Sequence, residues 1–210
     1  LVANVKAIKF FYSAARQGHV RAAIELAAQL EEKPNVKNMG TPEEWHKAVT
    51  NNLSKIIAQS KAGDPFAQTS LGFLYGFGIG VTKDPKKYVF WQRAAADQGF
   101  AAGQYHLSYA LESGTGIKKN PELALQWMQK AAGQGLVYAQ DRLGEMYRDG
   151  IGTKPDTERA IKWFKKATTV DYFISERKLA DAYLALGRFA DAAPHAQRSY
   201  DKIHKIYGSS

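Results

Sequence analysis

One stretch of the sequence, residues 143–152, reads LGEMYRDGIG, and its pattern recurs at a fixed distance. Residues 107–116 read LSYALESGTG and residues 71–80 read LGFLYGFGIG, so leucine and two glycines return every 36 residues. Five columns keep this period: Leu71, Leu107, Leu143 and Leu179; Gly78, Gly114 and Gly150; Gly80, Gly116 and Gly152; Trp91, Trp127 and Trp163; Ala95, Ala131 and Ala167. Such agreement indicates a repeat array, in which each unit stacks on its neighbour to bury an apolar face.

Each unit reads as a helix, a glycine loop and a second helix. In the first helix of one unit, Ala139, Leu143, Met146 and Tyr147 recur at a spacing of three to four residues, which makes one apolar face. The glycines that follow supply the positive φ that such turns need. The second helix is expected to begin at a capping residue, Asp84, Asn120 or Asp156, and to turn its tryptophan toward the core.

The pattern predicts an all-α solenoid of helix-turn-helix repeats with about eleven helices and no strands. We expect a single solenoid domain over residues 1–210. Within it, residues 1–62 are divergent N-terminal repeats, residues 63–170 are regular repeats, and residues 171–207 form a tetratricopeptide-like C-terminal repeat. In the divergent part, Thr41–Glu44 is a predicted capping box and Val2–Gln17 a predicted second-type helix.

Composition excludes several classes of protein. The chain is 45% hydrophobic and 23% charged, as in a folded globular protein rather than a disordered one. It has no cysteine, which excludes disulfides, thiolate metal sites and cysteine nucleophiles. Its net charge of +9 is spread along the chain and favours anionic partners by steering. The chain begins with Leu1 rather than Met, so the sequence leaves open whether a leader was removed or further repeats lie upstream.

The pattern Leu143-Gly144-x-x-Tyr147-x-x-Gly150-x-Gly152, followed by Ala160-x-x-Trp163-x-x-x-Ala167, resembles the Sel1-like repeat family, which is tetratricopeptide-like. The resemblance is strong over residues 63–170 and loose over residues 1–62, with departures at Ser108 and Leu111. It implies a right-handed α-solenoid and, in most members, a non-catalytic adaptor. Many bacterial members work in the periplasm or at the cell surface, and some repeat proteins of this type act as immunity partners of secreted toxic enzymes.

No motif of the sequence predicts catalysis. The glycine loops lack the Gly-Lys-Ser/Thr of a phosphate-binding loop, and no Gly-x-Ser-x-Gly elbow is present. The five histidines show no His-Glu-x-x-His spacing, which the helical metal sites of metalloproteases require. We therefore predict no catalytic residue, no metal ligand and no cofactor.

The first helices line the concave groove in tetratricopeptide-like solenoids, so their outward positions are the candidates for binding. With the period-36 leucines as inward anchors, the positions two and five residues away face the groove. Tyrosines there are predicted anchors, and the charged residues are predicted to set the register of the partner. The predicted partner-binding residues are Phe73, Tyr105, Tyr109, Glu112, Tyr138, Asp141, Glu145, Arg148, Arg177 and Asp181.

These observations predict a non-catalytic module that binds another protein through this groove. Two alternatives stay open: an immunity or inhibitor protein that neutralises a secreted toxic enzyme, and a cell-envelope scaffold that binds peptidoglycan or another anionic glycan. A nucleic-acid partner is not expected, because exposed lysines and aromatics lie on different helices. A membrane-spanning helix is not expected either, since no apolar run reaches ~18 residues. We expect a periplasmic or cell-envelope location, with the cytoplasm and the oligomeric state left open.

Overall fold

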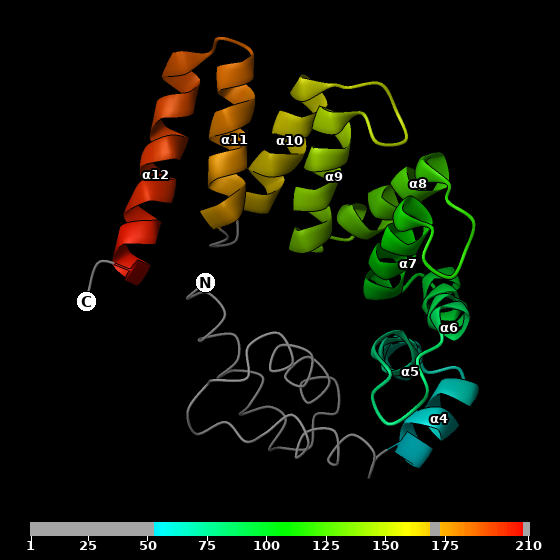
Figure 1. Ribbon diagram of the computed structural model, residues 1–210. Coiled ribbons are helices and arrows are strands. Elements are labelled where there is room, and N and C mark those ends of the chain that lie inside the picture. The colour runs from blue at the N-terminus through cyan, green and yellow to red at the C-terminus, as the bar shows by residue number, and fades with distance from the viewer. Residues whose placement is uncertain (1–52, 169–172, 208–210) are drawn as a thin grey trace. The chain divides into compact units, whose positions relative to one another are not determined.

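The computed structural model describes residues 53–168 and 173–207, and every regular element in these ranges is an α-helix (Figure 1). The described helices are α4 (Leu53–Lys61), α5 (Pro65–Phe77), α6 (Pro85–Asp97), α7 (Ala101–Ser113), α8 (Pro121–Gly133), α9 (Val137–Asp149), α10 (Thr157–Thr168), α11 (Phe173–Ala185) and α12 (Phe189–Tyr207). Consecutive helices pack in pairs, such as α5 with α6, α9 with α10 and α11 with α12. The all-α repeat class is thereby confirmed. The predicted capping box and the helix over Val2–Gln17 lie outside the described residues.

The described residues fall into two compact units. One contains residues 53–103 and 115–117, and the other contains residues 104–114 and 118–207. Each unit is described by itself below, and a single domain over the whole chain stays a prediction. None of the described helices combines the length and the apolar character that a membrane-spanning helix needs.

The predicted turns and caps are confirmed where the repeats are regular. Helices α5 and α9 end at Gly78 and Gly150, whose φ values of 79° and 72° are left-handed. The Oδ1 of Asp84 accepts hydrogen bonds from the N–H groups of Lys86 and Lys87 at the start of α6. Asn120 and Asp156 cap α8 and α10 in the same way, through Leu123 and Arg159.

The two helices of a repeat meet at a glycine. A Cβ atom placed on Gly144 of α9 would lie 2.5 Å from Cε1 of Phe164 of α10, so only a bare backbone allows this approach. The same holds for Gly72, whose Cβ would lie 2.7 Å from the side chain of Gln92. Ser108 departs from this glycine column and compensates with a hydrogen bond of 2.7 Å from its Oγ to the carbonyl oxygen of Ala124.

The periodic tryptophans are not the centre of the core, which corrects the expectation from the sequence. Trp91, Trp127 and Trp163 are each only half-buried. The residue that follows each tryptophan is fully buried instead: Gln92, Met128 and Phe164 are 0% exposed. The next residue lies about 100° further round the helix, so it faces the first helix while the tryptophan lies at the rim. There Lys130 and Lys166 cover Trp127 and Trp163 at 4.1 and 4.0 Å from the ring centroids.

We expect Phe164→Ala to lower the free energy of unfolding by ~3–5 kcal/mol, because a large side chain leaves a cavity at a fully buried position. Trp127→Ala should lower it by only ~1–2 kcal/mol, since the half-buried indole already meets solvent. Urea unfolding followed by far-ultraviolet circular dichroism measures both without relying on tryptophan emission. Equal losses for the two variants would contradict this placement of the core.

We also expect Gly152→Ala to be more destabilising than Gly135→Ala. Both glycines have left-handed φ values, 71° and 86°, so both variants carry the same torsional cost of ~1–2 kcal/mol. A Cβ atom on Gly152 would lie 2.2 Å from the carbonyl oxygen of Pro121, whereas nothing lies within 4 Å of one on Gly135. The additional clash should cost a further ~1–3 kcal/mol in the same unfolding assay. Equal losses of unfolding free energy for the two variants would mean that the loop at Gly152 moves to accept the Cβ atom without strain.

Candidate functional site

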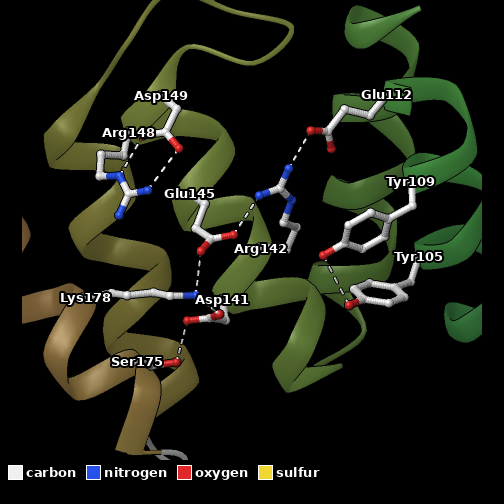
Figure 2. A network of polar contacts seen from close by, with 10 residues as sticks. All are labelled: Tyr105, Tyr109, Glu112, Asp141, Arg142, Glu145, Arg148, Asp149, Ser175 and Lys178. Carbon is white, nitrogen blue, oxygen red and sulfur yellow. Dashed lines mark hydrogen bonds and ion pairs between the residues drawn. The ribbon is translucent and has the colours of Figure 1, made fainter. Parts of the chain in front are cut away.

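Polar side chains of three first helices are joined in the second compact unit (Figure 2). We call this set the first-helix network; its members are Glu112 of α7, Asp141, Arg142 and Glu145 of α9, and Ser175 and Lys178 of α11. Adjacent to it on α7 are Tyr105 and Tyr109. The network therefore connects side chains from three successive repeats.

Arg142 is the centre of the network. Its Nη2 donates to Oε1 of Glu112 at 2.5 Å and its Nη1 donates to Oε2 of Glu145 at 2.7 Å. Its guanidinium carbon also lies 5.4 Å from the centroid of the Tyr109 ring. Burial by itself lowers the pKa of Arg142, but the hydrogen bonds that its guanidinium donates to the carboxylates of Glu112 and Glu145 outweigh this effect and raise the pKa. Arg142 is therefore a permanent charge that links α7 to α9.

Lys178 makes the equivalent link from α9 to α11. Its Nζ lies 2.5 Å from Oδ2 of Asp141 and 2.6 Å from Oε1 of Glu145. The Oγ of Ser175 donates to Oδ1 of Asp141 at 2.6 Å. The side chains of Lys178 and Asp141 are only 15% and 8% exposed, so solvent screens this pair weakly. Burial alone raises the pKa of Glu145, but hydrogen bonds from Lys178 and Arg142 outweigh it and lower the pKa.

The charges of the network are nearly balanced among themselves. Three carboxylates, those of Glu112, Asp141 and Glu145, meet the two cations Arg142 and Lys178. Groups paired in this way are held in place; within the network, the buried polar atoms without a hydrogen-bond partner among the described residues are Oε2 of Glu112 and Nε of Arg142. The arrangement therefore holds α7, α9 and α11 in register. Nothing in it activates a nucleophile or positions a general base.

Two tyrosines of the first helices provide exposed apolar area in this unit. The Tyr109 side chain is 36% exposed and Tyr138, in the first turn of α9, is 58% exposed. The hydroxyl of Tyr105 lies 3.4 Å from that of Tyr109, and the two rings meet edge to face with centroids 4.9 Å apart. The edge-to-face contact with Tyr105 and the cation–π contact with Arg142 fix the Tyr109 ring without covering it.

A cavity of about 570 Å³ lies beside Tyr109. It is lined by Tyr109, Glu112, Ser113, Lys119, Pro121, Gly150, Ile151 and Gly152. Its charged groups are the Lys119 ammonium and the Glu112 carboxylate, and Oε2 of Glu112 is buried with no hydrogen-bond partner among the described residues. Among the described residues, no group of three or more His, Asp or Glu side chains is arranged to hold a metal ion.

The structure corrects the expected exposure of two predicted partner-binding residues. Phe73 is only 8% exposed and packs against Phe77 and Tyr88, with ring centroids 6.1 and 6.4 Å away. It also belongs to the first compact unit, whereas the other predicted residues belong to the second. Asp141 is 5% exposed, because Lys178 and Ser175 draw its carboxylate inward. Both lie too deep to meet a partner as they stand.

The other predicted residues are divided between the network and the surface. Glu112 and Glu145 are half-buried in ion pairs. Arg148 is half-buried and pairs with its neighbour Asp149, with N to O distances of 2.7 and 2.9 Å. Arg177 and Asp181 of α11 are exposed.

Sequence reasoning missed Arg142, Asp149, Ser175 and Lys178. For the two cations a signal was present, since Arg142 and Lys178 are 36 residues apart and each directly precedes an anchor leucine. A basic residue at that column, with acidic residues at the neighbouring groove columns, could have indicated pairing between repeats. Ser175 and Asp149 carried no comparable signal.

The comparisons with known proteins agree with this architecture. The family model described as the Sel1 repeat matches residues 4–19, 65–100, 101–136 and 137–169, more than half of the 210 residues. A comparison with curated proteins gives no match.

Solved structures with the same fold are also found. One is c5321, a protective antigen present in uropathogenic Escherichia coli strains displaying an SLR fold, with 28% identity and a TM-score of 0.65 over 92% of this chain. This chain spans 40% of the length of that antigen. A Sel1 repeat protein from Oxalobacter formigenes is 30% identical, with a TM-score of 0.57 over 62% of this chain and 98% of its own. MamA, at 16% identity, covers 78% of this chain and 91% of its own with a TM-score of 0.55, and shows the fold alone.

We expect Glu145→Gln to destabilise the protein by ~1.5–3 kcal/mol at neutral pH, because two charge-assisted hydrogen bonds are weakened. The lowered pKa of Glu145 means that the wild-type carboxylate contributes its stability above the ordinary glutamate pKa and loses it as the pH falls through its lower, folded-state pKa. The difference between wild type and variant should therefore shrink as the pH falls below the ordinary glutamate pKa in urea unfolding experiments.

Glu122→Gln is the matched control, since Glu122 is exposed and has no ion pair among the described residues. This control should not reproduce the loss of stability expected for Glu145→Gln. A Glu145→Gln deficit that stays constant from neutral to acidic pH would argue against a stabilising Glu145 carboxylate.

Proposed function

The chain belongs to the Sel1 repeat family, and from that premise we propose that it is a non-catalytic module that binds another protein through the exposed surface of its first helices. The Sel1 repeat fold is typical of protein–protein interaction modules and generally serves as a non-catalytic scaffold. In this chain the surface in question is that of α7, α9 and α11 in the second compact unit. In tetratricopeptide-like solenoids these helices line the groove.

The observation that carries this proposal is the presentation of Tyr109 and Tyr138 on an ion-paired support. Tyrosine combines a large apolar ring with a polar hydroxyl, and it is enriched among the residues that dominate binding energy. The Tyr109 ring is already fixed by Tyr105 and by the guanidinium of Arg142. A ring that is ordered before binding loses little side-chain entropy when a partner covers it.

The charged residues take a different part in binding from the one expected from sequence. Asp141, Glu145 and Glu112 hold the helices in register through ion pairs with Arg142 and Lys178. The groups left to orient a partner are Arg177 and Asp181, which are exposed and have no ion pair among the described residues. Affinity would then come mainly from aromatic burial and orientation from these two charges.

An anionic glycan of the cell envelope is the second candidate partner. The observation that favours it is a set of exposed lysines in the second compact unit with no ion pair among the described residues: Lys118, Lys119, Lys154 and Lys162. Such binding would be weakened strongly by salt, because exposed charges are screened within ~8 Å at physiological ionic strength. A periplasmic or envelope location belongs to the same proposal, and its support is the likeness to a chain described as a protective antigen.

An immunity or inhibitor role is a narrower form of the main proposal. It requires the partner to be a toxic enzyme whose active site the module covers. The identity of the captured protein decides between an adaptor and an inhibitor, since both would use the same tyrosine surface.

We expect the double variant Tyr109→Ala/Tyr138→Ala to weaken partner binding by at least ~30-fold, which corresponds to the loss of one hot spot of ~2 kcal/mol. The measurement is affinity capture from lysate and envelope fractions of the native host, at low and high salt, followed by titration calorimetry with the captured protein. Phe90→Ala is the matched control, because Phe90 is a 62% exposed aromatic on the second helix α6.

One protein retained in high salt by the wild type and by Phe90→Ala, but not by the double variant, would support the tyrosine surface. Equal binding by the double variant would contradict it. Capture of glycan alone, reversed by salt and equal for all three proteins, would favour the envelope scaffold instead.

A further inference from the structure

The cavity beside Tyr109 lies where three elements meet in the second compact unit. Its lining residues come from the end of α7, from the segment that leads into α8, and from the loop between α9 and α10. All of them belong to the second compact unit. At about 570 Å³ the cavity falls within the ~300–1,000 Å³ that is typical of ligand sites, so it can receive a large side chain with its neighbouring backbone.

The walls of this cavity are mainly apolar and are held in place. Tyr109, Pro121 and Ile151 contribute an aromatic ring, a pyrrolidine ring and a branched aliphatic chain, and Gly150 and Gly152 contribute bare backbone. The loop lies directly on the start of α8, because a Cβ atom on Gly152 would come within 2.2 Å of the carbonyl oxygen of Pro121. Such walls favour a large apolar group as occupant, since covering them removes apolar surface from water.

The carboxylates closest to the cavity are already paired with cations. Oε1 of Glu112 accepts a hydrogen bond from Arg142 at 2.5 Å, and its other oxygen is buried (Figure 2). Asp149, which precedes the lining residue Gly150, is paired with Arg148 at 2.7 and 2.9 Å. These two carboxylates therefore add little net negative charge to the cavity.

The lysines around the cavity lack such partners. Lys119 lines it, and Lys118 and Lys154 lie one and two residues along the chain from lining residues. All three are exposed and have no ion pair among the described residues. They meet one exposed carboxylate without an ion pair, that of Glu122, which follows Pro121. The charge around the cavity is thus positive and complements an anionic group.

The composition of these walls is particular to one repeat. The position of Tyr109 is taken by Phe73 one repeat earlier and by Glu145 one repeat later. Phe73 is only 8% exposed, and Glu145 is half-buried in ion pairs. The position of Ile151 is taken by Thr115 one repeat earlier. The cavity is therefore not a by-product of the 36-residue period, which supports a specific role for it.

We propose that this cavity receives an aromatic or branched aliphatic side chain from an acidic segment of the partner protein, and that a carboxylate beside that side chain pairs with Lys119. This inference rests on the proposed function, because it states the chemistry of the partner that binds the surface around Tyr109. An acidic segment also matches the net charge of +9, which attracts anionic partners over a longer range.

Small molecules that carry the same two groups test the cavity without the partner. The probe is 3-phenylpropionate, followed through the backbone amide resonances of Gly150, Ile151 and Gly152 in ¹H–¹⁵N spectra. We expect saturable shifts with a dissociation constant on the order of a few millimolar, as for a ligand of this size. The analogue 3-phenylpropylamine, with an ammonium group, and glucuronate, with a polar body, should each bind at least ~5-fold more weakly.

Reversing one charge should reverse the preference between these probes. Lys119→Glu should bind 3-phenylpropylamine at least ~5-fold more tightly than 3-phenylpropionate, because the exposed cation at the cavity becomes an anion. Lys162→Glu is the matched control, since Lys162 is an exposed lysine of α10 that does not line the cavity. This control should keep the preference of the wild type. Both substitutions are at exposed positions, and far-ultraviolet circular dichroism checks that the variants are folded.

A peptide connects the probes to a protein partner. Acetyl-Asp-Asp-Phe-Asp-Asp-amide should bind at least ~10-fold more tightly than the same peptide with alanine in place of phenylalanine, or with lysines in place of the aspartates. Ile151→Asp should weaken binding of the first peptide at least ~10-fold, because it places a carboxylate in the apolar wall.

The inference is overturned if 3-phenylpropionate leaves the three amides unshifted up to about 20 mM, well above the expected dissociation constant. It is also overturned if glucuronate binds equally well, which would indicate an anionic glycan, or if Lys119→Glu keeps the preference of the wild type. Its failure differs from that of the proposed function. A captured protein that Tyr109→Ala/Tyr138→Ala loses, but that Lys119→Glu and Ile151→Asp bind unchanged, would support the tyrosine surface and contradict the role of the cavity.

Discussion

The ring of Phe164 lies against the bare backbone of Gly144, and this contact sets how closely the two helices of a repeat pack. A Cβ atom on Gly144 would come within 2.5 Å of the ring, so any other residue would push α9 and α10 apart. Because the next first helix, α11, packs on α10, that distance also determines how far apart α9 and α11 lie. The ion pairs of Lys178 with Asp141 and Glu145, at 2.5 and 2.6 Å, tolerate little change in that spacing.

The first-helix network specifies register more than it adds stability. Removing two charges from water costs several kcal/mol, and their attraction commonly only offsets this cost. An alternative stacking of the helices that separated Arg142 from Glu112 and Glu145 would leave these charges half-buried and unpaired. A half-buried unpaired charge has a much higher free energy than the same charge in water. The network thus penalises wrong arrangements of α7, α9 and α11. A surface held in one arrangement is a better support for Tyr109 than a mobile one, because less order has to be gained on binding.

The fold was predictable from the sequence because its signals are local and repeated. The turn glycines, the caps Asp84, Asn120 and Asp156, and the period-36 leucines each act within one unit, so a single chain shows them several times. The role of the tryptophans was not predictable in this way, since periodicity shows that a position matters but not whether it is core or rim. The burial of Asp141 was unpredictable for another reason: it depends on Lys178 and Ser175, which lie 37 and 34 residues away on another helix.

The way in which side chains pair within and between repeats explains why this chain has two surfaces of different character. Along α7, α9 and α11 most of the network's charged groups are paired with one another, so the surface offers a partner mainly aromatic area with a few charges at its edge. On α12, Phe189, Tyr200 and Ile203 are 70%, 58% and 37% exposed, so the outer side of this helix keeps apolar area that no described residue covers. Ala193 and Ala196, which are also exposed, make this side less apolar than a buried helix face and so reduce indiscriminate association.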